Sequence, residues 1–287
     1  MTVRIGISGW RYPGWRGTFY PQGLAQRREL EYVGTRLRTV ELNGSFYSLQ
    51  TPASYRRWRA ETPDGFVFAV KGSRFVTHMK KLKDVEVPLA NFFASGVLLL
   101  GPKLGPILWQ FPAGWKFDAE RFAAFLRLLP RTTAQAAALA EHHDDRLLGR
   151  SWTEAEADAP LRHAFEVRHP SCFCPEFAEL LRAHDAALVL ADTAGKWPYA
   201  EELTAGFVYA RLHGAEELYA SGYSDAQLDW WAERIRHWAA GREPADARRI
   251  TDRPAPSAKR DVYVYFDNDA KVHAPFDALR LAERLGS

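Results

Sequence analysis

Eight short apolar segments recur along this 287-residue sequence, separated by stretches of helical periodicity or by loops. Most are apolar at consecutive positions, which is typical of strands covered on both faces in a parallel sheet. The predicted strands are residues 4–8, 39–42, 67–71, 107–111, 163–168, 187–191, 207–212 and 262–266. Because barrels of roughly 250 residues are routinely one domain, this alternation predicts a single TIM-barrel-like (β/α)8 domain over residues 1–287.

Three intervening segments have complete helix signals. Asp118 is a predicted N-cap, Pro175 stands in a predicted first turn, and Ser224 caps a segment that ends at Gly241. Their apolar stripes predict packing against the strands. Two further segments, about 131–162 and 243–260, exceed what one connection requires and are predicted to be insertions on the barrel surface.

Composition limits the classes of function. The sequence has 38 basic and 35 acidic residues, and a net charge of +3 does not by itself indicate a nucleic-acid partner. No apolar run reaches the roughly 20 residues of a membrane span, and the first residues do not resemble an export signal. We therefore expect a cytoplasmic protein that does not interact with membranes. Cys172 and Cys174 lack the partners of a structural zinc site and are predicted to be packing residues.

Polar residues gather where the predicted strands end, which is where TIM barrels build their active sites. Residues i and i+2 of a strand face the same way, so Glu166 and Arg168 are predicted to share one pocket. The same argument pairs Glu41 with Asn43 and Arg211 with His213. Further polar groups at strand ends are Lys71, Gln110, Asp192, His169, Asp267, Asn268 and Asp269. So many ionisable groups favour a polar ligand over a structural plug, although mutual pairing would also satisfy them.

Several strings resemble one protein family in order along nearly the whole chain. They are GISGWRYPGW, FYP, TVELNGSFY, FAVKGSRFVTHMKKL, GPILWQFP, AFEVRHPS, RLHG and VYFDNDA. The chain resembles the family catalogued as domain of unknown function 72, the YecE-like proteins. The resemblance implies a TIM-barrel-like fold, in agreement with the strand count, and supplies no established reaction.

The resemblance places the family's motif positions on a defined set of residues here. These are Trp10, Tyr12, Pro13, Trp15, Glu41, Asn43, Phe46, Tyr47, Lys71, Thr77, His78, Gln110, Glu166, Arg168, His169, Arg211 and His213. Where the family usually has N-S-T-F-Y, residues 43–47 of this sequence are NGSFY. Where the family usually has F-N-N-D, residues 266–269 are FDND. Cys172 replaces an aromatic residue. The second departure places the role of Asp267 in question and leaves Glu166 and Arg168 unaffected.

The leading hypothesis is an enzyme of hydrolase, lyase or isomerase type that acts on a polar, anionic small molecule, for example a phosphorylated one. The predicted catalytic residues are Glu166, Glu41, His213 and Asp192, with His213 or His78 as the acid. A carboxylate beside Arg168 should stay ionised. The predicted binding residues are Arg168, Lys71, Arg211, Asn43, Gln110, Trp10, Tyr12, Tyr47, His78, His169 and Asn268.

Three alternatives remain open at this point. A divalent metal could use Glu41, Glu166, Asp192 and His213, although no cofactor is predicted and no nucleotide-binding motif is present. A nucleic acid could use the basic segment 71–83 with aromatic residues at the same rim, namely Trp10, Tyr12, Trp15, Phe46 and Tyr47. A non-catalytic interaction barrel is favoured if the polar residues prove fully paired with one another.

Overall fold

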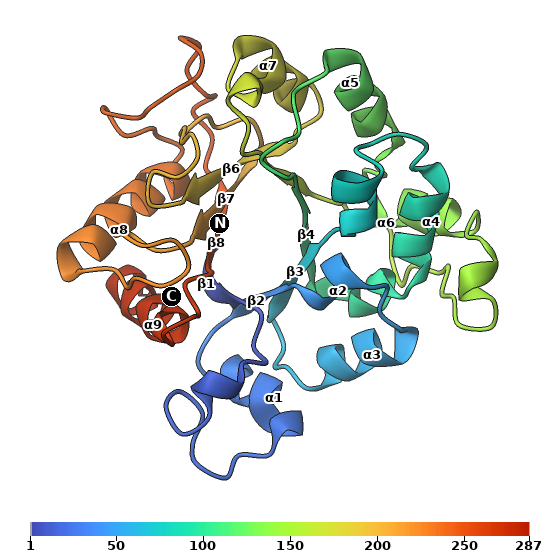
Figure 1. Ribbon diagram of the computed structural model, residues 1–287, viewed down its shortest axis with the longest axis horizontal. Helices are drawn as coiled ribbons and strands as arrows, with labels where there is room; N and C mark the ends of the chain where they lie inside the picture. Colours follow the sequence, from blue (N-terminus) through green and yellow to red (C-terminus); the bar gives the residue numbers. More distant parts are fainter. Residues whose placement is uncertain (1, 287) are drawn as a thin grey trace.

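The computed structural model describes residues 2–286, and the strands within that range form one closed parallel barrel in chain order (Figure 1). The predicted (β/α)8 fold is therefore confirmed. The strands are β1 (Val3–Ser8), β2 (Thr39–Leu42), β3 (Val67–Lys71), β4 (Leu104–Gln110), β5 (His163–Glu166), β6 (Ala187–Asp192), β7 (Phe207–Leu212) and β8 (Asp261–Phe266). The two largest differences from the predicted bounds are in β4, which begins three residues early, and in β5, which ends before Arg168 because its pairing with β6 stops at Phe165. The other bounds that differ do so by one residue.

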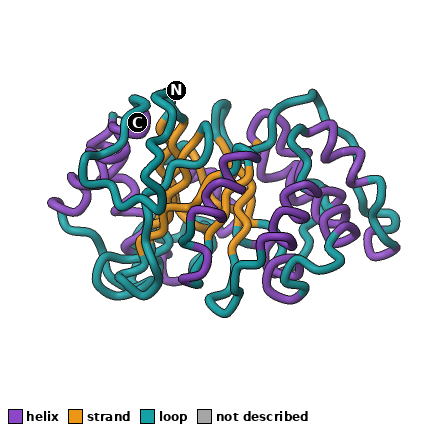
Figure 2. The backbone as a smooth tube through the Cα atoms, turned by 90° about the horizontal axis from the view of Figure 1, so that it is seen from above, coloured by secondary structure: helices purple, strands orange, loops and turns teal. Residues whose placement is uncertain are grey.

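Helices surround the barrel, with the strands at the centre in both views (Figures 1 and 2). They are α1 (Glu29–Gly34), α2 (Gly44–Tyr47), α3 (Pro52–Ala60), α4 (Glu86–Ala94), α5 (Ala119–Leu128), α6 (Thr133–Ala140), α7 (Pro175–Ala183), α8 (Asp225–Ala239) and α9 (His273–Leu285). The predicted caps are present, since Asp118 and Ser224 each accept a hydrogen bond from a backbone N–H in the first turn of α5 and α8. None of the helices in residues 2–286 combines the length and apolar character that a membrane span requires.

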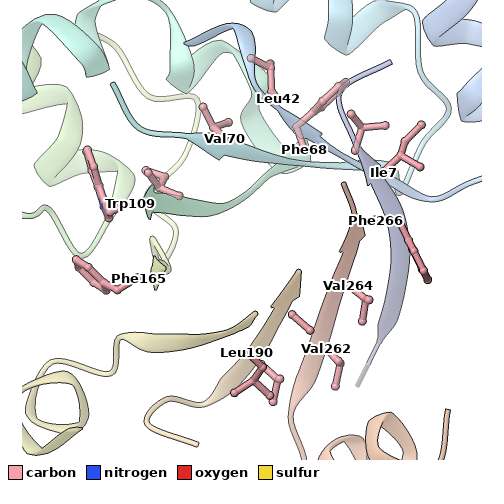
Figure 3. Packing of buried hydrophobic residues seen from close by; sticks show 14 of the residues in the cluster. Ile7, Leu42, Phe68, Val70, Trp109, Phe165, Leu190, Val262, Val264 and Phe266 are labelled. Carbon is pink, nitrogen blue, oxygen red and sulfur yellow. The ribbon is translucent and has the colours of Figure 1, made fainter. Parts of the chain in front are cut away.

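Two sets of strand residues fill the two sides of the barrel wall. Ile7, Phe68, Trp109 and Phe266 point outward into the main apolar core beneath the helices (Figure 3). A second cluster lies inside the barrel. It consists of Val67, Ala69, Leu108, Ala164, Ala187, Val189, Ala191, Ala205, Phe207, Tyr209, Tyr263 and Tyr265. The inward side is thus closed by small residues and tyrosines, and polar side chains continue this side at the carboxyl ends of the strands.

The β6–β7 connection has no helix within residues 193–206, unlike the connections that follow β7 and β8. The segment 243–260 packs against this connection. Glu201 N–H donates to the Arg248 carbonyl at 2.7 Å, and the Glu202 carboxylate accepts from the N–H groups of Ile250 and Thr251. This segment, predicted as a surface insertion, therefore covers the place where a helix is missing.

Candidate active site

Arg211 lies at the centre of the C-terminal mouth of the barrel and is fully buried. Its Nε donates to Glu41 Oε2 at 3.0 Å, and its Nη2 donates to Glu41 Oε1 at 2.8 Å. Its Nη1 donates to Glu166 Oε2 at 2.5 Å. Nη2 also reaches Asp267 Oδ2 at 2.9 Å. One guanidinium therefore joins carboxylates from β2, β5 and the end of β8. Burial opposes the charge on Arg211, but these three carboxylates raise its pKa well above the ordinary value.

Glu41 is fully buried, and both of its oxygens are engaged. Ser8 Oγ donates to Oε1 at 2.5 Å, and Tyr209 Oη donates to Oε2 at 2.7 Å, in addition to the two bonds from Arg211. These four donors occupy the lone-pair sites of the Glu41 carboxylate, which a substrate proton would need. Glu41 is therefore placed to fix the guanidinium, and it lacks the free oxygen that a general base requires.

Glu166 and Arg168 contact each other, as the i, i+2 argument predicted. Arg168 donates to Glu166 Oε1 through Nε at 2.9 Å and Nη2 at 2.7 Å, and Gln110 donates to the same oxygen at 2.8 Å. Burial opposes the charge on Glu166, but Arg211 and Arg168 hold its pKa well below the usual range. Glu166 is thus an ionised carboxylate bound on both oxygens.

Asp267 joins this network, although its departure from the family pattern had placed its role in question. Its Oδ2 accepts from Arg211, and His213 Nδ1 lies 3.0 Å away without the alignment of a strong hydrogen bond. Despite burial, Arg211 and His213 lower the pKa of Asp267. His213 is fully buried, with Nε2 at 3.4 Å from Arg211 Nη1. Arg211 and His213 thus lie on the same side of the chain and contact each other, as the i, i+2 argument predicted.

Lys71 differs from the other cations at the mouth. Its side chain is buried, and within residues 2–286 no acceptor hydrogen-bonds to Nζ and no carboxylate pairs with it. Its Nζ lies 4.4 Å from the centre of the Phe46 ring. Burial and the neighbouring Arg211 lower the pKa of Lys71 to about 8, against the opposing charges of Glu41, Asp267 and Glu166. Lys71 is therefore a buried amine near its titration point at physiological pH.

His78, which interacts electrostatically with Lys71, and Asp269, which interacts electrostatically with Asp267, also have shifted pKa values. His78 is half-buried in a π-helical turn (Phe75–Met79), a feature frequent at functional sites. Burial, then Lys71 and Arg168, lower the His78 pKa to about 4, which keeps the imidazole neutral. Burial and the charge of Asp267 raise the pKa of Asp269 to about 6. The prediction that His78 supplies the acid is not favoured by this pKa, whereas Asp269 has the pKa of a proton donor near neutrality.

Asp192 lies on a different face from the ion network. The β6–β7 register pairs Ala191 with Arg211 and Asp192 with Leu212, so Asp192 faces the helix side. Its Oδ2 accepts from Tyr223 Oη at 2.8 Å. The outward direction of Asp192 could have been predicted from the sequence, because its neighbour Ala191 faces inward and strand residues alternate. The predicted grouping of Asp192 with the other catalytic candidates is not seen in these contacts.

The remaining predicted binding residues lie at varied places. Asn43 donates to Ser8 Oγ at 2.8 Å, so it lies beside Glu41 as predicted. His169 accepts from the Ser171 N–H and caps a short 3-10 turn. Asn268 is buried and donates to Asp277 and to the Ser221 carbonyl. The last two therefore make contacts that support loops outside the network.

The predicted aromatic rim is largely wrong. Trp10, Trp15 and Phe46 are buried, with exposed fractions of 6%, 1% and 7%, because they pack against other rings. Tyr12 is half-buried and donates to the Ser8 carbonyl at 2.5 Å. Tyr47 alone among these five rings is largely exposed, at 65%. This result removes most of the stacking surface on which the nucleic-acid alternative depended.

The metal alternative is not supported by the geometry. The Arg211 guanidinium stands between Glu41 and Glu166, and Asp192 faces elsewhere. Across residues 2–286, no three His, Cys, Asp or Glu side chains converge in a way that could hold a metal ion. A cation between these carboxylates would have to displace a guanidinium that already satisfies them.

Sequence reasoning missed several residues of the site. Tyr209 and Ser8 bond Glu41, and Tyr219 Oη accepts from Arg168 Nη2 at 3.2 Å. Trp197 lies under the Arg168 guanidinium, 3.9 Å from its ring centre. Ser8 and Tyr209 could have been found by alternation, since they continue the inward faces of β1 and β7. Tyr219 and Trp197 lie in loops, where strand periodicity says nothing.

The fold and the site together define a (β/α)8 barrel with a buried carboxylate–guanidinium network at its C-terminal mouth. The chain belongs to the DUF72 family, described as "Protein of unknown function DUF72", whose sequence profile matches residues 4–287. The resemblance noted in the sequence is thereby confirmed.

Two curated relatives show similarity over part of their length. UPF0759 protein YunF of Bacillus subtilis is 30% identical over 133 residues, which cover 44% of this chain and 45% of YunF. UPF0759 protein YecE of Escherichia coli is 29% identical over 111 residues, covering 39% and 38%. The chain thus aligns with less than half the length of these relatives.

Two solved structures share the fold over essentially the whole chain. A DUF72 family protein from Thermotoga maritima superposes with a TM-score of 0.73 and 25% identity, covering all of both chains. One from Enterococcus faecalis superposes with a TM-score of 0.70 and 17% identity, covering 100% of this chain and 96% of the other. At 17% identity the second likeness concerns the fold alone.

Proposed function

We propose that this protein is an enzyme that binds a small anionic molecule over the C-terminal ends of the strands, with Lys71 at the centre of the site. The observation that carries this proposal is the Lys71 side chain, which is only 7% exposed while its Nζ has no protein acceptor within residues 2–286. A buried ammonium without a partner is unfavourable for the fold, so its presence favours a ligand that completes it.

Lys103 is an internal comparison, because it is exposed to the same 7% as Lys71. Its Nζ donates to the carbonyls of Arg59 and Thr62 and to the Thr62 hydroxyl. This lysine is satisfied in the way expected of a buried structural cation. The contrast indicates that Lys71 is not retained as a structural group.

The charges of the ion network bear on the proposed site, because they determine how many cations remain to attract an anion. Glu41, Glu166 and Asp267 bear three negative charges, which Arg211 and Arg168 offset only in part. Lys71 supplies the third positive charge without contacting a carboxylate. An anion bound at Lys71 would also meet Arg168, whose Nη1 has no acceptor in residues 2–286. Arg168 would contribute Nη1 alone, because its Nε and Nη2 already donate to Glu166, and this contact would be a charge-assisted hydrogen bond.

Proton transfer in this proposal falls to Lys71 and Asp269. Their pKa values of about 8 and about 6 lie on either side of neutral pH, the range in which acid–base catalysis is most efficient. Glu41 and Glu166, which the sequence nominated as acid or base, are assigned the positioning of Arg211 and Arg168. The reaction classes compatible with such a pair are hydrolysis, elimination and isomerisation.

Binding of ribose 5-phosphate and of inorganic phosphate tests this proposal directly. Isothermal titration would compare the native protein with Lys71→Met and with Lys83→Met, an exposed lysine of the neighbouring loop. We expect Lys71→Met to weaken phosphate binding at least tenfold, and Lys83→Met to change it less than twofold. Equal binding by the native protein and Lys71→Met would refute the proposed site.

A non-catalytic barrel is the competing interpretation, because Glu41, Glu166 and Arg211 satisfy one another. It predicts that neither phosphate compound binds at the mouth, with or without Lys71. The same titrations therefore separate the two interpretations.

A further inference from the structure

A cavity of about 440 Å³ lies beside the barrel mouth, between the β6–β7 connection and the first turns of α8. It is hereafter called the aromatic cavity. Five aromatic residues contribute to its wall, namely Trp197, Tyr199, Tyr223, Trp230 and Trp231. Its volume lies within the roughly 300–1,000 Å³ range of small-molecule sites. The helix-free β6–β7 connection forms one side of the cavity, and Arg248 of the segment 243–260 also lines it.

We propose that the aromatic cavity binds a planar nitrogen heterocycle that forms part of the anionic ligand. This inference rests on the proposed function for the anionic part, but the ring site has its own evidence. Trp230 is 40% exposed although it is large and apolar, and its ring meets Trp231 edge to face at 4.9 Å. Exposed aromatic surface in a hollow of this size is typical of ligand sites.

A polar group in the wall indicates a heterocycle in preference to a hydrocarbon ring. Asp192 lines the cavity, and its Oδ1 receives one long bond, 3.3 Å from the Ala194 N–H. Burial raises the pKa of Asp192. A ring bearing N–H groups would donate to this oxygen, which a hydrocarbon ring would leave with the long bond alone.

The cavity adjoins the ion network through one wall residue, Trp197, which contacts Arg168. Trp197 lines the cavity, and the Arg168 guanidinium lies over its ring at 3.9 Å. Arg168 in turn binds Glu166 in the ion network. A molecule with its ring in the aromatic cavity and its anionic group near Arg168 and Lys71 would occupy both sites. The substrate class inferred is therefore an anionic derivative of a nitrogen heterocycle.

Titration of matched probes tests the ring and the anion separately. Adenosine supplies the heterocycle without the charge, ribose 5-phosphate supplies the charge without the ring, and adenosine 5′-monophosphate supplies both. Phenyl phosphate supplies a charged ring without nitrogen. We expect the monophosphate to bind at least tenfold more tightly than ribose 5-phosphate or phenyl phosphate, because stacking and polar edge contacts add to the anion contact.

Two variants assign the ring to this cavity. Trp230→Ala removes an exposed wall residue and is expected to weaken adenosine binding about tenfold, with ribose 5-phosphate binding unchanged. Asp192→Ala removes the carboxylate of the cavity wall and is expected to weaken adenosine binding several-fold. Phe276→Ala, an exposed ring of α9 in contact with Phe19, is the control and should alter neither ligand.

The outcomes distinguish failure of this inference from failure of the proposed function. If adenosine does not bind, or if Trp230→Ala and Asp192→Ala leave its binding unchanged, the ring site is refuted. Ribose 5-phosphate binding that depends on Lys71 would still uphold the anion site in that case. The opposite result is also informative. If adenosine binding depends on Trp230 while Lys71→Met does not change binding of adenosine 5′-monophosphate, the ring site is upheld and the anion site is refuted.

Discussion

Arg211 and Glu41 form a two-bond ion pair across the barrel, although β1 and β8 stand between their strands. Both side chains are fully buried. The pair therefore joins opposite parts of the barrel mouth through its interior. The two residues depend on each other, because loss of either one would leave the other's buried charge without this partner.

Arg211→Met should destabilise the protein severely. The change leaves Glu41, Glu166 and Asp267 without their shared cation in a buried site, and breaking such a pair costs about 3–5 kcal/mol. Urea unfolding followed by tryptophan fluorescence would measure the loss. The double variant Arg211→Met with Glu41→Gln should recover part of it, because one buried charge is removed. A single variant as stable as the native protein would contradict the role assigned to this network.

Lys71→Met should stabilise the fold, in contrast to the Arg211 change. At neutral pH the native protein keeps Lys71 charged and unpaired, and its lowered pKa corresponds to a penalty of about 1–3 kcal/mol. Below pH 8 the folded and unfolded states both hold the proton, so the full penalty applies. Between pH 8 and 10.5 the folded state releases the proton first, and the native protein gains stability.

Thermal unfolding of the two proteins at pH 7, 8, 9 and 10 would test this relation. The stability advantage of Lys71→Met should shrink steadily across that series. Lys83→Met is the control and should show no such trend, because Lys83 is exposed. An advantage that stays constant with pH would contradict the assignment of Lys71 as a destabilised ammonium.

Anion binding should also weaken as the pH rises through about 8. The reason is that Lys71, whose pKa is about 8, loses the charge that attracts the ligand, while Arg168 and Arg211 keep theirs. Phosphate titrations at pH 6.5 and 9.5 would measure the effect, with sulfate as a probe that does not itself change charge in this range. A loss of about tenfold or more is expected, and pH-independent sulfate binding would exclude Lys71 as the titrating group.

Asp267→Asn should lower the pKa of Asp269. Burial is the main cause of its value of about 6 and would remain, but the charge of Asp267 is the second cause and would disappear. Carboxyl carbon NMR titration should therefore place the pKa of Asp269 below 6 and above its ordinary 3.8. Glu217→Gln, at an exposed position of the β7–α8 loop, should leave the titration unchanged. An unaltered pKa in Asp267→Asn would separate Asp269 from the ion network.

Gly6→Ala should disrupt closure of the barrel between β1 and β2. A Cβ at residue 6 would collide with the Thr39 carbonyl oxygen, which is backbone and cannot move without breaking strand pairing. Overpacking of this kind costs about 1–3 kcal/mol or more. Chemical unfolding should show the loss, whereas Gly114→Ala, where a Cβ meets nothing within 4 Å, should be close to neutral.

The sequence by itself determined the barrel and much of its polar mouth. Strand periodicity is a local property, so β2, β3 and β7 were predicted with their observed bounds, and Glu166 and Arg168 were correctly placed together. The i, i+2 rule also held for Arg168 and His213, which lie just beyond the ends of β5 and β7. The same alternation makes Ala191 face inward and Asp192 outward, so the predicted grouping of Asp192 with the network did not follow from it.

Tertiary structure alone decided which charges are satisfied. Whether a buried cation meets a carboxylate depends on the closure of the barrel, which brings Arg211 to Glu41, Glu166 and Asp267 and leaves Lys71 without an acceptor in residues 2–286. The same closure buries Trp10, Trp15 and Phe46, which local sequence had placed at an exposed rim. Pairing and burial are set by residues distant in the chain, and no local periodicity encodes them.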